Sequence, residues 1–444
     1  MGGSSSTVRA RREERGGGSV LGVAMVVLGL LSLAALQYVM PISSRYPGSI
    51  NPPGARQWAQ WLGGGFPMPM SVETFLWSFR AIVVVVWIGY ALVVYSGLRR
   101  GITRPMRILA VAAALAVVLA FLFPPSLSHD LYAYLGYARM GALYDLNPYV
   151  HSLQEIARQG DVAAVHYPTP LPSVYGPVWT LLSSGIAWLL SSAALPAQLV
   201  ALKLVEVAAL IGGAVSARAI ARVWDPRHAD LALVAFALNP LLLLEGPGNG
   251  HNDVLMVALM LAGIALVLRS SWKLGFLVLG VSVGVKFVSL AIVPWLVLEM
   301  VRRMSWRRAA GRTAVSGVLV LAPVLLALLP FWTGPGTLWG LGAMYNTRSS
   351  GDTTMRAGVV FVVFLYAVLT VWVWRGRGER LAPAWTLWST AGILFAIPGI
   401  LPWYLSWPTS VTLTRWDRRQ AVISVACMVL GVRWMLYYTA LRGG

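Results

Sequence analysis

The chain has 444 residues, of which 57% are hydrophobic and 11% are charged. Soluble domains carry about 25% charged residues, so this composition excludes a protein whose whole surface faces water. The net charge of +19 is also typical of nucleic-acid-binding proteins, but the basic residues lie in short clusters between apolar runs, as in the cytoplasmic loops of membrane proteins. The single cysteine, Cys427, excludes a disulfide framework and a cysteine-based metal site.

Apolar runs that can cross a bilayer begin at residue 20 and continue to the C-terminal region. A helix of about 20 apolar residues spans the ~30 Å hydrocarbon core and satisfies its own backbone groups there. The first run is too long for the core of a signal peptide, so we expect a retained span. The sequence predicts an all-α, polytopic transmembrane bundle of about thirteen spans. The predicted spans are 20–40, 73–97, 107–125, 197–219, 229–246, 254–269, 273–286, 287–301, 310–331, 357–375, 382–399, 402–414 and 420–440.

Clusters of Lys and Arg fix the expected orientation, because an excess of these residues marks the cytoplasmic side. An even number of spans must then separate neighbouring clusters. This parity places the stretch 175–193 on the outer surface as a juxtamembrane helix, and it divides the long run 273–301 at Lys286. We expect a multi-pass protein of the cell membrane. Its N-terminus is expected in the cytoplasm. The clusters are 9–15, 99–107, 218–227, 269–273, 302–312, 375–380 and 415–419, and the segments expected outside are 126–172, 245–253 and 332–355.

The first outer segment carries a carboxylate, Asp130, shortly after Pro124 and Pro125 end a span. Aromatic rings stack on sugar faces, and amides and hydroxyls bond to sugar hydroxyls, so the surrounding side chains suit a sugar carried on a lipid. The candidate substrate-binding residues of this segment and its continuation are His129, Tyr132, Tyr134, Asn147, Tyr149 and Tyr175. The alternative is that Asp130 caps a helix while the tyrosines form an interfacial belt. Both interpretations stay open at this point.

The second outer segment is a short turn that follows the helix-breaking pair Asn239-Pro240. A connecting turn needs one or two polar residues, whereas this one holds five: Glu245, Asn249, His251, Asn252 and Asp253. Ionisable groups beside a membrane are functional candidates by default, so we expect the last four to bind substrate. The alternative is a plain helix cap. Two ligands do not make a metal site, so no metal is predicted, although a divalent ion is not excluded.

Three basic residues lie in or beside predicted spans, where a positive charge requires an anionic partner. Lys286 interrupts an apolar run, and its partner is either a lipid phosphate or one of the acids of the turn. Arg348 flanks the third outer segment and is a second candidate phosphate ligand. Lys203 and Glu206 lie one turn apart in another span and are expected to pair with each other.

The last candidate residues are Trp403 and Tyr404, in an aromatic cluster at the outer end of a span. This cluster is either a membrane-interface belt or a platform for a sugar. Together with the outer segments, it places the polar residues on one side of the membrane, which disfavours a transporter, because a transporter needs them near the midplane.

These motifs together resemble the GT-C superfamily of membrane glycosyltransferases, in particular the bacterial polyprenol-phosphomannose-dependent mannosyltransferases. That group includes the α-1,6-mannosyltransferases and glycosyltransferase family 87. The resemblance covers roughly residues 107–415. The motifs that carry it are His129-Asp130-Leu131-Tyr132-Ala133-Tyr134, Asn147-Pro148-Tyr149, Tyr175-Gly176-Pro177-Val178-Trp179, Asn239-Pro240, Gly250-His251-Asn252-Asp253, Lys286 and Pro402-Trp403-Tyr404.

The resemblance implies a GT-C type bundle in which Asp130 is the general base and juxtamembrane helices follow it. It implies a polyprenyl-phosphate sugar as donor, a glycan or glycolipid as acceptor and no cofactor. The expected regions are a cytoplasmic basic tail (1–19), two extra N-terminal spans (20–106), a catalytic membrane domain (107–415) and a C-terminal span (416–444). The expected activity is inverting transfer of a hexose, mannose by resemblance, on the outer face. The alternatives are a multi-pass transporter or lipid flippase and a membrane scaffold without catalysis.

Overall fold

The computed structural model describes residues 4–38, 58, 60–62, 71–125, 127–338, 353–376, 378–397 and 401–436. Every regular element in these ranges is helical, which confirms the all-α fold. Among the described residues, seven helices are long and apolar enough to cross a membrane by length and composition. Several shorter apolar helices accompany them, so the number of spans remains a prediction.

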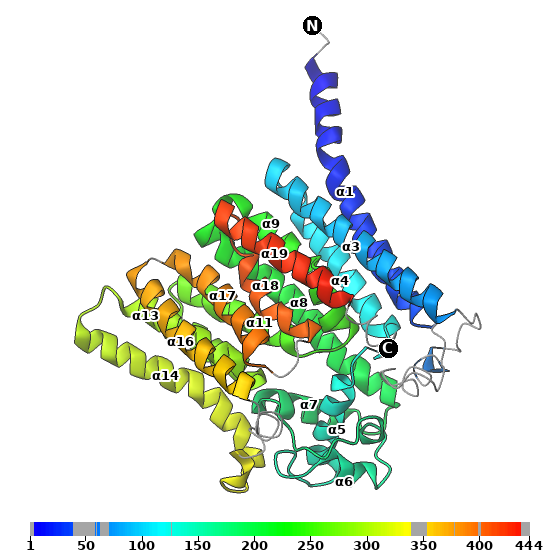
Figure 1. Ribbon diagram of the computed structural model, residues 1–444, viewed down its shortest axis with the longest axis vertical. Coiled ribbons are helices and arrows are strands. Elements are labelled where there is room, and N and C mark those ends of the chain that lie inside the picture. Colours follow the sequence, from blue (N-terminus) through cyan, green and yellow to red (C-terminus); the bar gives the residue numbers. More distant parts are fainter. Residues whose placement is uncertain are drawn as a thin grey trace.

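The helices follow the predicted spans closely, because apolar runs of this length have no other way to satisfy their backbone in lipid. They are α1 (Ser4–Leu36), α3 (Val72–Arg100), α4 (Pro105–Leu122), α8 (Leu195–Trp224), α9 (Ala229–Ala237), α10 (Pro240–Leu243), α11 (Asp253–Leu268), α12 (Trp272–Val285), α13 (Ile292–Val301), α14 (Trp306–Leu328), α16 (Thr353–Arg375), α17 (Leu381–Phe395), α18 (Ser406–Thr412) and α19 (Arg418–Met435). One difference is that α1 already begins at Ser4, within the predicted tail, and projects beyond the bundle in Figure 1.

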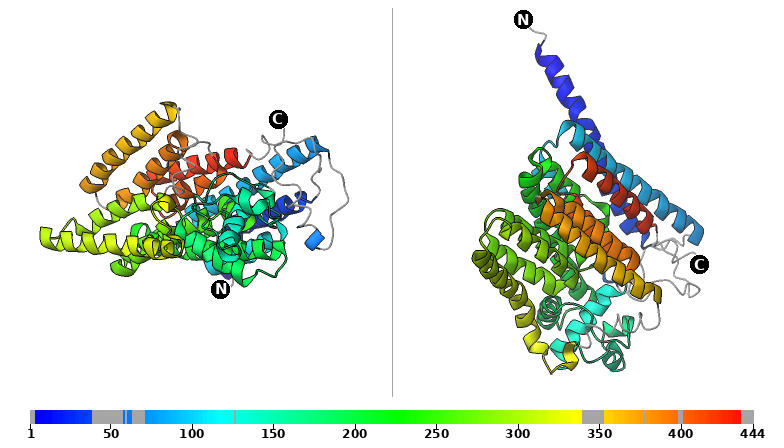
Figure 2. Two further views of the ribbon diagram at one scale, coloured as in Figure 1. Left: turned by 90° about the horizontal axis from the view of Figure 1, so that it is seen from below. Right: turned by 60° about the vertical axis from the view of Figure 1, so that its left-hand side comes forward.

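The bundle has a centre and two flanks. Helices α8, α11 and α18 occupy the centre, α13, α14 and α16 lie on one flank, and α1 and α3 lie on the other (Figures 1 and 2). Glycines permit close packing of the N-terminal pair, because a Cβ on Gly89 of α3 would lie 2.6 Å from the Cβ of Met25 in α1. The C-terminal α19 packs on α3, where the indole N–H of Trp87 contacts the sulfur of Met435 at 2.9 Å.

The long run that was expected to divide at Lys286 does so. Lys286 has extended backbone angles, φ −154° and ψ 123°, between α12 and a short 3₁₀ segment, η4 (Phe287–Ala291), that leads into α13. Extended angles end an α-helix. The break turns the Lys286 side chain toward the centre of the bundle instead of leaving it on a continuous helix.

The segment expected outside, 126–172, and the stretch that follows it fold into short helices at one end of the molecule, and they are called the outer segment below (Figure 1). They are α5 (Asp130–Leu143), α6 (Leu153–Ala157), the 3₁₀ turn η1 (Ala164–His166) and α7 (Pro177–Leu189). Helix α7 corresponds to the predicted juxtamembrane helix. Only glycine fits at Gly176, just before α7, because a Cβ there would overlap the backbone oxygen of Gly284 near the end of α12.

A buried ion pair ties this outer segment to the bundle. The Nε of Arg139 in α5 donates to Oδ2 of Asp161 at 2.8 Å, and its Nη1 donates to Oε1 of Gln198 in α8 at 3.1 Å. Asp161 is fully buried and also accepts from the backbone N–H groups of Ala163 and Ala164, both at 3.0 Å. These contacts fix the position of α5 relative to α8, and therefore the position of Asp130, the first residue of α5.

Replacing Asp161 with Asn should destabilise the protein strongly, since it leaves the Arg139 guanidinium buried without its counter-charge. Removing one partner of a buried ion pair typically costs about 3–5 kcal/mol. The matched control is Glu155→Gln, which removes a partly exposed pair with His151 in the same segment and should cost less than about 1 kcal/mol. Thermal unfolding of the two variants in detergent would measure this, and equal midpoints would contradict the anchoring role.

Candidate functional site

The second outer turn is built by an irregular stretch of helix. The side chain of Asn239 caps α10 by accepting from the backbone N–H of Leu241 at 3.0 Å and of Leu242 at 3.3 Å. Asn239-Pro240 therefore restarts a helix at this point rather than only ending one. A π-helical turn, η3 (Leu244–Gly248), follows at once. Such turns are uncommon and occur frequently at functional sites.

Backbone hydrogen bonds then fold the chain back over this π-helical turn. The N–H of His251 donates to the carbonyl of Glu245 at 2.8 Å, and that of Gly250 donates to Gly246 at 2.6 Å. Gly250 has φ +79°, a left-handed conformation that glycine adopts without cost. A Cβ on Gly250 would also lie 2.7 Å from a methyl group of Leu131 in α5. The turn and the start of α5 therefore lie in direct contact.

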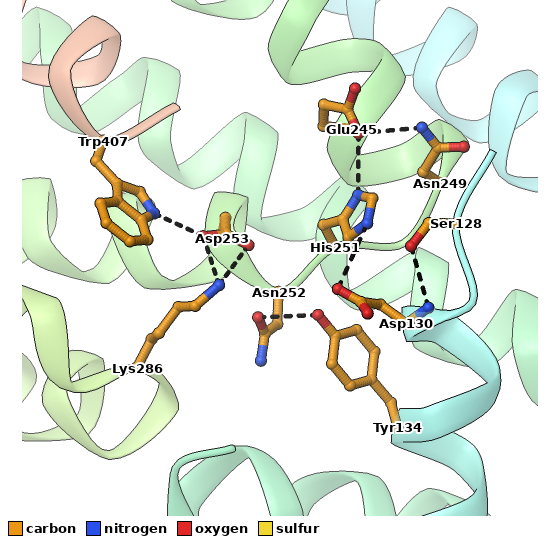
Figure 3. A network of polar contacts seen from close by, with 10 residues as sticks. All are labelled: Ser128, Asp130, Tyr134, Glu245, Asn249, His251, Asn252, Asp253, Lys286 and Trp407. Carbon is orange, nitrogen blue, oxygen red and sulfur yellow. Dashed lines mark hydrogen bonds and ion pairs between the residues drawn. The ribbon is translucent and has the colours of Figure 1, made fainter. Parts of the chain in front are cut away.

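Three consecutive residues of the turn face three different partners, as Figure 3 shows. The Nε2 of His251 lies 3.7 Å from Oδ2 of Asp130. The Oδ1 of Asn252 accepts from the hydroxyl of Tyr134 at 3.2 Å. The two carboxylate oxygens of Asp253 accept from Nζ of Lys286 at 2.7 and 2.8 Å. One turn thus joins α5 of the outer segment to the break in the bundle at Lys286.

Asp130 is the first residue of α5, and its side chain is 26% exposed. Its backbone N–H donates to the hydroxyl of Ser128 at 3.1 Å, and its carboxylate faces His251. Among the described contacts, no hydrogen bond joins this carboxylate to the first turn of α5, so the geometry does not favour the capping alternative. Burial raises the pKa of Asp130 above its ordinary value, while the charge of Lys286, and that of His251 when its ring is protonated, opposes the shift.

The other ring nitrogen of His251 faces two fully buried residues, Glu245 and Asn249. Its Nδ1 is 3.0 Å from Oε2 of Glu245, and Nδ2 of Asn249 donates to the same oxygen at 3.1 Å. The imidazole stacks on the indole of Trp403, with ring centroids 3.9 Å apart and planes inclined by 19°. The imidazole therefore has a carboxylate beside its Nδ1 edge and an indole against one face.

The third residue of the turn, Asp253, is a buried acid that binds the ammonium group of Lys286. Asp253 is fully buried and accepts a third hydrogen bond, from the indole N–H of Trp407 at 2.6 Å. Nζ of Lys286 lies 5.1 Å from the ring centre of Tyr404 and 5.6 Å from that of Trp407, within cation–π range. The Lys286 side chain remains 23% exposed. Its closest partner is therefore the acid of the turn, and part of it still faces solvent.

Other predicted residues lie around this network or away from it. Tyr175 packs edge-on against Tyr134, at 4.5 Å between ring centres. His129 stacks on Tyr167 at 5.2 Å, and Tyr132 packs against His166 at 4.7 Å. These rings flank Asp130.

Asn147 and Tyr149 connect their stretch of the outer segment to the end of α14 and to α7, and among the described contacts neither bonds to the network. Asn147 donates to the carbonyl of Phe331 at 2.6 Å, and the buried Tyr149 donates to Thr180 at 2.8 Å. Arg348 lies outside the described residues.

The expected pairing of Lys203 with Glu206 is wrong. Both side chains are fully buried, but Lys203 donates to the backbone carbonyl of Phe123 at the end of α4, and Glu206 accepts from the N–H of Leu255 at 2.9 Å. Helix ends leave backbone groups without intrahelical partners, and these two charged side chains satisfy such groups on neighbouring helices.

Three members of the network, Ser128, Glu245 and Trp407, were not predicted as site residues. The sequence identified Glu245 only as a possible partner of Lys286, whereas it contacts His251. Trp407, which donates to Asp253, was not selected from the aromatic cluster that contains Trp403 and Tyr404. Its spacing of four residues from Trp403 was the available signal, because such residues share a helix face. The described residues contain no group of three or more His, Cys, Asp or Glu side chains that could hold a metal ion.

Replacing Gly250 with Ala should destabilise the protein more than replacing Gly160 with Ala. Both glycines have a similar positive φ, +79° and +81°, so both substitutions carry the backbone cost of about 1–2 kcal/mol. Only Gly250 adds an overlap with Leu131, since nothing lies within 4 Å of a Cβ on Gly160. Thermal unfolding of both variants would compare them, and equal losses would contradict the close contact between the turn and α5.

The chain also matches known proteins over the region that contains this network. The family model described as "Alpha-(1->6)-mannopyranosyltransferase, N-terminal domain" matches residues 19–302. A relative from Mycobacterium tuberculosis, named alpha-(1->6)-mannopyranosyltransferase A, is 27% identical over 422 residues, which cover 82% of this chain and 75% of the relative.

A second alpha-(1->6)-mannopyranosyltransferase from Mycobacterium tuberculosis is 23% identical over 403 residues, which cover 70% of this chain and 66% of the relative. No solved structure shows a significant match. The family model covers well over half of the chain and includes Asp130, the turn that faces it and Lys286. The chain therefore belongs to the alpha-(1->6)-mannopyranosyltransferase family.

Proposed function

We propose that the protein transfers a mannose from a polyprenyl-phosphate donor to a hydroxyl group of a glycan or glycolipid acceptor, on the outer face of the cell membrane and with inversion. One observation carries the proposal. A partly exposed carboxylate, Asp130, faces His251 of the buried turn, and a partly exposed ammonium, Lys286, is bonded to Asp253 of the same turn. Inverting transfer needs these two groups: a base for the acceptor and a cation for the leaving phosphate.

The steps follow from the chemistry of the two groups. The acceptor oxygen attacks the anomeric carbon, the bond from that carbon to the phosphate oxygen breaks, and polyprenyl phosphate leaves with the bonding electrons. Asp130 takes the proton of the acceptor hydroxyl. Lys286 stabilises the charge that develops on the phosphate, and Arg348 is proposed as a second cation. The aromatic side chains of Tyr404 and the residues flanking Asp130 suit the faces of the sugars.

His251 is suited to receive the proton from Asp130. Its Nε2 lies 3.7 Å from the Asp130 carboxylate, which is close enough for a hydrogen bond to form after a small movement. The family membership and this pairing favour glycosyl transfer over the transporter and scaffold alternatives.

Replacing Asp130 with Asn should reduce transfer by about 10²–10⁴-fold, the usual effect of losing a general base. Purified protein would be incubated with a polyprenyl-phosphate mannose and an alkyl mannoside, and the release of polyprenyl phosphate measured. The control is Asp145→Asn, an exposed acid in the same outer segment with φ +54°, a conformation that Asn tolerates. Full activity in Asp130→Asn would exclude the general-base role.

The outer segment should be reachable from outside the cell. A cysteine in place of the exposed Gln159, in a Cys427→Ser background, should react with an impermeant thiol reagent in intact cells. Gln159 is chosen over Ser152 of the same segment, because Ser152 belongs to a helix capping box that a cysteine would disturb. A cysteine in place of the exposed Arg303, in a basic cluster, should react only after permeabilisation. The reverse pattern would invert the proposed orientation and place the donor on the cytoplasmic face.

A further inference from the structure

Glu245 is a buried carboxylate whose charge neither proposed step uses directly. It is fully buried in the π-helical turn, where ionised groups are costly unless they are paired and hydrogen-bonded. Its Oε2 lies 3.0 Å from Nδ1 of His251 and accepts from Asn249 at 3.1 Å. Its backbone carbonyl accepts from the N–H of His251. The two residues are therefore linked through both backbone and side chain (Figure 3).

The two nitrogens of the His251 ring face two different acids. An acid oxygen lies 3.0 Å from Nδ1; it is not aligned for a hydrogen bond with the ring, but its negative charge favours a proton on that nitrogen. In the neutral ring, Nε2 then carries a lone pair, and this lone pair faces Asp130. An ionised Asp130 and a lone pair have no proton to share, which is consistent with their separation of 3.7 Å, longer than a hydrogen bond. Once Asp130 holds a proton, it can donate that proton to Nε2.

We infer that Glu245 is a positioning residue, which holds His251 in the tautomer whose Nε2 accepts a proton from Asp130. The inference rests on the proposed function. The proton of the acceptor hydroxyl moves to Asp130 and from there to Nε2, while the proton on Nδ1 stays beside Glu245. The imidazolium charge is then balanced by the Glu245 carboxylate. After the product leaves, the proton returns through the partly exposed Asp130 to water, and the site is restored.

A second buried glutamate provides the comparison. Glu206 is also fully buried, but its Oε2 accepts from the backbone N–H of Leu255 in the first turn of α11. Its contact is with the backbone, and a glutamine at this position retains an oxygen that can accept the same hydrogen bond. A glutamine at Glu245 is different, because its neutral amide can donate or accept at Nδ1 and no longer selects one tautomer of His251.

Glu245→Gln should therefore lower kcat by about tenfold or more, equivalent to ~1.4 kcal/mol, and leave KM for the polyprenyl-phosphate mannose nearly unchanged. Glu206→Gln should keep the activity of the wild type and serves as the control for loss of a buried carboxylate. Glu245→Asp retains the charge on a shorter side chain and should be more active than Glu245→Gln. A Glu245→Gln variant with wild-type kcat would overturn the inference.

A double-mutant cycle separates positioning from a general structural role. If Glu245 acts through His251, Glu245→Gln should cause no further loss in a His251→Ala background, whereas independent effects would multiply. Multiplying losses would overturn the inference. If Glu245→Gln does not fold, Asn249→Ala takes its place in the cycle. It removes the hydrogen bond to Glu245 and should give a smaller loss that also disappears in the His251→Ala background.

Failure of this inference differs from failure of the proposed function. Inactive Asp130→Asn protein together with fully active Glu245→Gln protein would refute the role of Glu245 and leave the proposed transfer intact. A wild-type protein that releases no polyprenyl phosphate would overturn both.

Discussion

Two carboxylates without access to water organise the centre of this molecule. Glu245 and Asp253 are fully buried beside a short turn, and charges in such a place persist only when partners surround them. Asp253 accepts hydrogen bonds from Lys286 and Trp407, and Glu245 lies beside the ring of His251. Because these partners come from the turn itself, from the end of α12 and from α18, satisfying two acids brings separate parts of the bundle to one point.

Irregular backbone is what makes this arrangement possible. The π-helical turn η3, the left-handed Gly250 and the extended Lys286 all interrupt regular helices within one small region. Such interruptions are tolerated at membrane depth where they lie inside the protein or line a polar space. The polar side chains of Glu245, His251 and Lys286 lie on or directly after these irregular positions, so the departures from regular helix coincide with the charged groups of the network.

The sequence predicts the helices well because hydrophobicity and length determine where a chain can cross lipid. The parity of the basic clusters predicts the break at Lys286, where a charge interrupts an apolar run. Partners are harder to predict. Lys203 and Glu206 have the spacing of an ion pair, yet each bonds to a backbone group at the end of another helix. Asn147 and Tyr149 were selected as sugar-binding candidates, and the structure adds bonds from them to the end of α14 and to α7 that the sequence did not indicate. Such outcomes depend on which helix ends lie nearby, and linear spacing does not contain that information.

The carboxylate and the ammonium of the network belong to different parts of the chain. Asp130 belongs to α5, which Arg139 links to α8 through a hydrogen bond, whereas Lys286 and Asp253 lie within the bundle. Sequence changes in the outer helices can therefore reshape the surroundings of one group without disturbing the other. Under the proposed function, the acceptor side of the reaction would then depend on the helices around Asp130 and the donor side on the bundle around Lys286, with the short turn at His251 in contact with both.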